Sequence, residues 1–176
     1  WYMKLMESWS EVRGRLCAIT TDPDIEAEMI IRHVMGLDRT GFFKNLMSQM
    51  VSAQFATVNQ YVSRRIYGEP LAYILGYREF YGLQFYVNPD VLIPRQETEV
   101  LVDSAIELVS NDRQIRLVDV GTGSGAIAIA LSKHLPNACA YAIDISCKAL
   151  RVADINRRKH GMEDRVHLFR GDILSP

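Results

Sequence analysis

Val118-Asp119-Val120-Gly121-Thr122-Gly123-Ser124-Gly125 is the stretch that decides the fold of this chain of 176 residues. A short apolar run, 115–120, leads into it, and a helical pattern, 127–134, follows it. Glycines at such a strand-to-helix turn let the backbone bend sharply and let a ligand approach without meeting a Cβ atom. The stretch therefore predicts a ligand-binding loop at the end of a parallel β-strand.

Helical and strand patterns alternate on both sides of this loop. A helical pattern covers 99–109, a second strand pattern covers 138–143, a further helix covers 149–160, and a third strand covers 166–169. This order predicts an α/β fold with parallel strands and right-handed helical crossovers, an open doubly wound sheet. Three strands make only part of such a sheet, so we expect its first half.

The chain before residue 98 has a different pattern. Apolar residues recur at helix spacing between Pro23 and Gly36 and again between Val51 and Ile66, which predicts a small helical bundle. Aromatic and β-branched residues then flank Gly82, and Asn88-Pro89-Asp90 follows them. This arrangement is typical of a β-hairpin, and we expect it to link two domains.

Composition excludes several classes of function. The formal net charge is −1, so no general positive field attracts nucleic acid or an anionic membrane. No apolar stretch reaches the ~20 residues that a membrane span needs. The three cysteines form no Cys-x-x-Cys pair, and the four histidines are scattered, so no metal site is predicted. We expect a cytoplasmic protein without direct nucleic-acid or membrane contacts, and the sequence leaves its oligomeric state open.

Two classes of ligand fit the glycine loop. Gly121, Gly123 and Ala126 match the dinucleotide pattern G-x-G-x-x-G/A, in which a helix N-terminus holds a pyrophosphate. Asp144 follows the second strand, where an acid can bind ribose hydroxyls. This acid suits a nicotinamide dinucleotide and S-adenosylmethionine equally.

Acids at three successive strand ends favour S-adenosylmethionine. Asp119 can accept hydrogen bonds from an amine, Asp144 from a ribose, and Asp172 from an adenine amino group, with Ile173 packing on the adenine ring. These groups suit a ligand with an amine, a ribose and an adenine but no phosphate. The positive charge of a sulfonium also suits an acidic lining.

Two motifs resemble those of a known family, the HemK/PrmC release-factor glutamine methyltransferases. The segments that look like its interdomain signature are Arg65 with Gly68-Glu69-Pro70-Leu71-Ala72-Tyr73-Ile74-Leu75-Gly76, then Glu79-Phe80-Tyr81-Gly82, then Leu92-Ile93-Pro94-Arg95-Gln96-Glu97-Thr98-Glu99. The run 119–125, followed by Asp144, matches the cofactor loop of the same family. The resemblance covers most of the chain, and the main departure within these motifs is Gln96, where the family more often has proline.

The resemblance implies roles for individual residues. The residues that would hold the methionine part of S-adenosylmethionine are Gly121, Thr122, Gly123, Ser124 and Gly125. Asp144 would bind the ribose, and Asp172 with Ile173 would flank the adenine, although family members often have an aromatic residue in place of Ile173. The residues that would lie over the cofactor pocket are Pro94, Arg95 and Glu97.

The implied reaction is methyl transfer from S-adenosylmethionine to the side-chain amide nitrogen of glutamine in the Gly-Gly-Gln motif of peptide chain release factors. In the family, an Asn-Pro-Pro-Tyr segment after the fourth strand grips this amide. The printed chain ends at Pro176, before any such segment, so no catalytic residue is assigned. We expect the printed chain to be inactive, with an exposed sheet edge that favours self-association.

The resulting domain scheme has three parts. A helical substrate-recognition domain is expected at 1–72, a β-hairpin linker at 73–97, and an incomplete Rossmann-like domain that binds S-adenosylmethionine at 98–176. Three alternatives remain open: another class I methyltransferase, a non-catalytic module that binds a partner, and a nicotinamide dehydrogenase.

Overall fold

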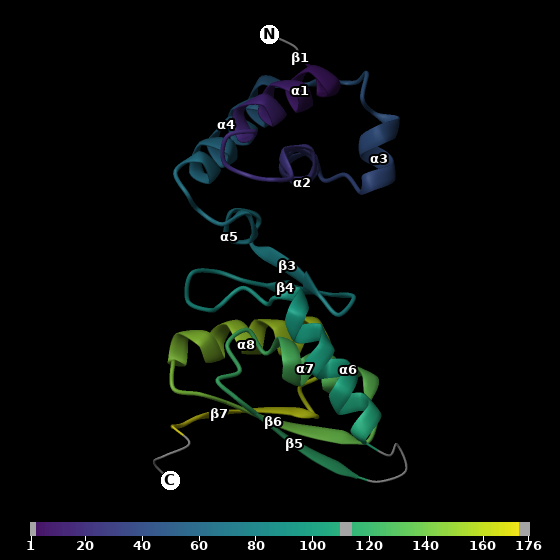
Figure 1. Cartoon of the computed structure of the whole chain (residues 1–176), viewed down its shortest axis with the longest axis vertical. Helices are drawn as coiled ribbons and strands as arrows, with labels where there is room; N and C mark the ends of the chain where they lie inside the picture. Colours follow the sequence, from purple (N-terminus) through teal and green to yellow (C-terminus); the bar gives the residue numbers. More distant parts are fainter. Residues whose placement is uncertain (1–2, 110–113, 173–176) are drawn as a thin grey trace. The chain divides into compact units, whose positions relative to one another are not determined.

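The computed structural model describes residues 3–109 and 114–172 (Figure 1). The chain forms two compact units, Trp1–Leu75 and Gly76–Pro176. The first unit is mainly helical, and the second combines helices with β-strands. The domain bounds expected from the sequence, including a separate hairpin linker at 73–97, stay predictions.

The first unit contains a group of helices and one short strand pair. Its elements are β1 (Met3–Lys4), α1 (Leu5–Leu16), α2 (Pro23–Met35), α3 (Arg39–Lys44), β2 (Gln49–Met50), α4 (Ser52–Ile66) and α5 (Leu71–Leu75), with β1 antiparallel to β2. Proline opens α2, and Gly36 ends it in a left-handed conformation with φ of 65°. The two helices expected from the apolar spacing are therefore confirmed, α2 and α4.

A largely buried ion pair joins α2 to α4. The Arg65 guanidinium donates two hydrogen bonds to the Glu26 carboxylate, at 2.7 and 3.0 Å. The Thr20 hydroxyl donates a third hydrogen bond to the same carboxylate at 2.9 Å. Because these side chains come from three separate segments of the first unit, the pair ties the helices together as well as satisfying its own charges.

The second unit contains the parallel sheet that the glycine loop predicts. Its strands are β5 (Ile115–Val120), β6 (Ala138–Asp144) and β7 (Val166–Arg170), in the order β5-β6-β7. The helices are α6 (Glu99–Leu108), α7 (Ala126–His134) and α8 (Cys147–Lys159). Each of these elements agrees with its predicted range to within two residues, and the α/β fold is confirmed.

The three helices α6, α7 and α8 lie on one face of this sheet (Figure 1). Strand β6 presents alanine to these helices at each buried position, Ala138, Ala140 and Ala142, and small side chains let helices approach the sheet closely. The opposite face carries exposed apolar side chains, among them Val118 and Phe169 at 63% and 50% exposure. Among the described residues no helix covers that face.

A β-hairpin packs on the helical side of the second unit. Strands β3 (Tyr77–Phe80) and β4 (Leu83–Tyr86) are antiparallel, and Tyr81 and Gly82 between them both have positive φ, 51° and 68°. Such a two-residue turn matches the twist of the strands that it joins. The Tyr81 backbone N–H donates to Glu99 at 2.9 Å, and its hydroxyl donates to Asp103 at 2.6 Å, which fastens the turn to α6. The predicted hairpin is confirmed.

Candidate functional site

The loop between β5 and α7 has a backbone that suits only glycine at alternate positions. Gly121, Gly123 and Gly125 have φ of 70°, 55° and 79°, values that other residues adopt only with strain. The backbone N–H groups of Gly121 and Thr122 both donate to the Ile143 carbonyl of β6, at 2.9 and 3.0 Å. The loop is therefore held against the end of the neighbouring strand.

Gly125 also marks a close approach between helices. A Cβ atom at this position would lie 3.1 Å from Ile129 Cδ1 and 3.3 Å from Ala153 Cβ. At Gly121, in contrast, a Cβ atom would meet no atom within 4 Å, so the backbone there borders open space. The first glycine thus leaves room for a ligand, and the last lets α7 pack against α8.

Two of the predicted acids, Asp119 and Asp144, accept hydrogen bonds from the glycine loop. Asp119 accepts hydrogen bonds from the Thr122 hydroxyl at 2.7 Å and from the Ala128 N–H at 3.3 Å. One oxygen of Asp144 accepts from the Gly123 N–H at 2.9 Å, and its other oxygen accepts from the Ser146 N–H at 2.9 Å. Both acids therefore hold the loop in shape in this structure.

Burial raises the pKa of Asp119 above the ordinary value of an aspartate. The hydrogen bonds from Thr122 and Ala128 oppose this shift, and the negative charge of Asp144 adds to it. Burial destabilises the ionised form of the Asp119 carboxyl. A positive charge close to it would stabilise that form.

The third predicted acid follows β7 at the same edge of the sheet. The Gly171 N–H donates to the Asp144 carbonyl at 3.2 Å, so the chain before Asp172 lies beside the end of β6. Asp172 itself is exposed. Ile173, the predicted adenine neighbour, lies outside the described residues.

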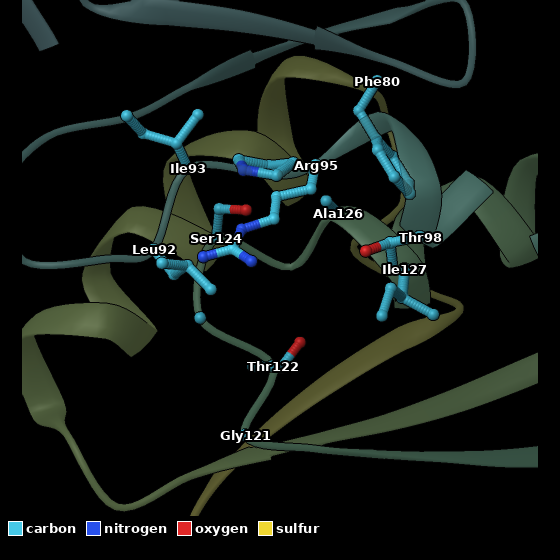
Figure 2. A pocket seen from close by; sticks show the side chains of 12 residues that line it. Phe80, Leu92, Ile93, Arg95, Thr98, Gly121, Thr122, Ser124, Ala126 and Ile127 are labelled. Carbon is cyan, nitrogen blue, oxygen red and sulfur yellow. The ribbon is translucent and has the colours of Figure 1, made fainter. Parts of the chain in front are cut away.

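A cavity of about 360 Å³ opens in front of the loop (Figure 2). Its lining residues are Phe80, Leu92, Ile93, Pro94, Arg95, Thr98, Gly121, Thr122, Gly123, Ser124, Ala126 and Ile127. Six predicted site residues are among them: Pro94, Arg95, Gly121, Thr122, Gly123 and Ser124. The predicted site residues Asp119, Gly125, Asp144, Asp172 and Glu97 are not part of this lining.

The remaining lining residues stand in the quoted motifs or next to the glycine loop, but no site role was predicted for them. Leu92 and Ile93 directly precede Pro94, so their place in the same motif is the signal that could have identified them. Ala126 and Ile127 open α7, and the first N–H groups of a helix lack an acceptor within it. Phe80 stands in the quoted motif Glu79-Phe80-Tyr81-Gly82, but an aromatic residue in a short strand is ordinarily a core residue.

A buried side chain from α8 connects the loop to the hairpin. Asn156 is 0% exposed, and its Oδ1 accepts from the Tyr86 N–H at 2.7 Å. Its Nδ2 donates to the Tyr86 carbonyl and to the Ser124 carbonyl, each at 2.9 Å. One amide thus joins β4, α8 and the cavity wall, and sequence reasoning did not identify it.

Two other properties bear on the site and its setting. The described part of the chain contains no cluster of three or more histidine, cysteine or acidic side chains that could hold a metal ion. Within the same residues, no helix is both long enough and apolar enough to span a membrane.

Comparison with known proteins identifies both parts of the chain. The PrmC N-terminal domain model matches residues 7–76, and a methyltransferase domain model matches residues 111–175. Both parts of the chain thus resemble the HemK/PrmC family. The resemblance expected from the two motifs is therefore confirmed, and the chain carries a methyltransferase domain.

Curated relatives align with most of this chain. The release factor glutamine methyltransferase of Coxiella burnetii is 38% identical over 162 residues, which cover 92% of this chain and 58% of the relative. That of Moorella thermoacetica is 41% identical over 175 residues, which cover 99% of this chain and 62% of the relative. The chain thus spans less than two thirds of the length of these relatives.

Proposed function

We propose that the protein containing this chain transfers a methyl group from S-adenosylmethionine to the side-chain amide nitrogen of glutamine in the Gly-Gly-Gln motif of peptide chain release factors. One observation carries the proposal: Pro94 and Arg95 of the interdomain signature line the same cavity as the glycine loop. The names of the relatives from Coxiella burnetii and Moorella thermoacetica supply the substrate class. Release factors act in the cytoplasm, which is therefore the expected compartment.

The residues around the cavity suit S-adenosylmethionine. The open space at Gly121 accommodates a ligand against the backbone, and the loop residues 121–125 would hold its methionine part. One oxygen of Asp144 accepts a hydrogen bond from Gly123 of the loop and the other from Ser146, whereas a carboxylate has about four acceptor sites. Asp144 can therefore bind ribose hydroxyls without releasing the loop, and Asp172 at the same edge would reach the adenine.

The bound cofactor would supply a methyl group on a positively charged sulfur. The glutamine amide nitrogen is a weak nucleophile, because its lone pair is delocalised into the carbonyl group. Catalysis must therefore depend largely on positioning the methyl group and the amide nitrogen together. In this scheme the braced loop provides a fixed cofactor position, and the helical first unit is the candidate recognition domain for the release factor.

Calorimetric titration of this chain with S-adenosylmethionine and with NAD tests the cofactor. We expect S-adenosylmethionine to bind and NAD to give no heat of binding. Binding of NAD alone would support a dehydrogenase and overturn the proposal.

Methyl transfer tests the substrate. The gene product that contains this sequence is incubated with labelled S-adenosylmethionine and a release factor. We expect label on the release factor and none on a variant whose Gly-Gly-Gln motif is changed to Gly-Gly-Asn. Equal labelling of both proteins would indicate another class I methyltransferase activity.

A further inference from the structure

Arg95 is the charged residue among the twelve described residues that line the cavity. The other lining side chains are apolar or carry a hydroxyl group, as Thr98, Thr122 and Ser124 do. Figure 2 shows the guanidinium group of Arg95 turned toward the interior of the cavity. The cavity therefore has a positive charge at one wall.

The guanidinium group makes no ion pair or side-chain hydrogen bond with any residue that the structure describes. Arg64 and Arg65, in contrast, each pair with a glutamate through two hydrogen bonds. Two acids of the second unit have other partners: Glu99 accepts from the Tyr81 N–H, and Asp144 accepts from the Gly123 N–H. Arg95 is thus left to pair with a ligand.

We propose that Arg95 binds the α-carboxylate of the methionine part of S-adenosylmethionine and so sets the direction in which the cofactor enters the cavity. This inference rests on the proposed function. A guanidinium matches a carboxylate through two parallel hydrogen bonds, whereas it repels the amine and the sulfonium of the same cofactor. The carboxylate is the group of this cofactor that carries negative charge, so Arg95 distinguishes one end of the ligand from the other.

The position of Arg95 fits this role. Ser124 and Thr122, in the loop proposed to hold the methionine part, line the same cavity. Asp119 and Asp144 lie behind that loop, outside the lining, so the negative charges are set apart from the guanidinium by the backbone. The cofactor carboxylate can therefore meet the positive charge of Arg95 at the cavity wall, where Asp119 and Asp144 do not compete for it.

Decarboxylated S-adenosylmethionine, which lacks only the carboxylate, tests the inference directly. Calorimetric titration of this chain should show that S-adenosylmethionine binds about tenfold more tightly than the decarboxylated form, the factor expected for a charged hydrogen bond. In Arg95→Gln, binding of S-adenosylmethionine should weaken by about the same factor while binding of the decarboxylated form stays unchanged or improves. Arg95→Lys should lie between the two, because it keeps the charge and loses the paired geometry.

Arg116→Gln is the matched control. Arg116 is an exposed arginine on β5 that does not line the cavity, so its replacement should change neither affinity. Thermal unfolding of each variant checks that the fold is kept. Equal affinity of the wild-type chain for both ligands, or an equal loss for both in Arg95→Gln, would overturn the role of Arg95 and leave the proposed function standing. If the wild-type chain binds neither ligand, the proposed function fails, and this inference fails with it.

Discussion

The Asn156 side chain donates a hydrogen bond to the Ser124 carbonyl oxygen at 2.9 Å, so helix α8 holds the glycine loop directly. The same amide makes two hydrogen bonds with the backbone of Tyr86 in the hairpin. Buried polar groups are costly unless they are paired, and this amide pairs three backbone groups at once. The cavity wall, the hairpin and α8 therefore form one hydrogen-bonded assembly.

Replacing this amide should destabilise the second unit and weaken the cofactor site. Asn156→Leu has a similar volume but leaves three backbone groups of Tyr86 and Ser124 without their partner, at a cost of about 3 kcal/mol in the free energy of unfolding. Urea unfolding measures this cost, and calorimetry measures the expected loss of affinity for S-adenosylmethionine. Arg151→Leu, at an exposed position on the same helix, should stay within about 0.5 kcal/mol of the wild-type value. A similar cost for both variants would contradict the role assigned to Asn156.

Alanine substitutions at Gly161 and Gly125, which both have positive φ, distinguish the cost of backbone strain from the cost of close packing. Gly161→Ala adds a Cβ atom into open space at φ of 65°, so strain alone should cost about 1 kcal/mol. Gly125→Ala has φ of 79° and also crowds Ile129 and Ala153, which should add about 1–2 kcal/mol. The difference between the two variants in urea unfolding gives the packing contribution. An equal cost at both positions would show that α7 and α8 can move apart freely.

The raised pKa of Asp119 predicts a specific pH dependence of stability. The folded chain binds a proton at this carboxyl at a higher pH than the unfolded chain does. Its stabilising contribution is therefore complete below the unfolded pKa and is lost as the pH rises through the raised folded pKa. Relative to Asp119→Asn, the free energy of unfolding of the wild-type chain should fall over this window and stay level above it. A difference that rises with pH over the same window would mean that the pKa is lowered.

The Glu26–Arg65 ion pair should stabilise the first unit against unfolding. Their side chains are 15% and 19% exposed, so Glu26→Ala leaves a guanidinium without its partner in a largely buried position. We expect a loss of about 2–3 kcal/mol, somewhat less than for a fully buried pair. Hydrogen exchange of the α4 amides reports on this unit separately from the sheet.

The matched control for that prediction is Asp24→Ala. Asp24 pairs with Arg13, but both side chains are more than half exposed, at 52% and 54%. Removing this pair should change the exchange of the same amides by no more than about 0.5 kcal/mol. If both variants gave the same loss, burial of the Glu26–Arg65 pair would not explain its effect.

Much of the fold was predictable because its signals are local. The apolar spacing and the turn residues predicted α2, α4 and the alternation from β5 to β7, and the hairpin followed from the residues around Gly82. The glycine loop was also recognisable, because its backbone conformation requires glycine at particular positions. What could not be predicted was the set of partners that each polar side chain has.

Asp119 and Asp144 illustrate this difference. Their positions at strand ends were visible in the chain, but both carboxylates bond to the loop and neither lines the cavity. In the sequence, nothing distinguishes Asn156 from the other polar residues of its helical pattern. Only the fold places it between Tyr86 and Ser124. Hydrogen bonds across 32 or 70 residues leave no periodic trace in a sequence.

By itself, the sequence determined the strand–glycine loop–helix unit, because steric limits on φ and the period of apolar residues act over a few neighbouring positions. The tertiary structure alone decided which residues meet in the cavity. It brought Arg95 into the cavity beside the loop, where its guanidinium forms no ion pair with any of the residues described. The physical reason is that charge pairing and burial depend on distance in space, which separate segments acquire only when the hairpin and the helices pack together.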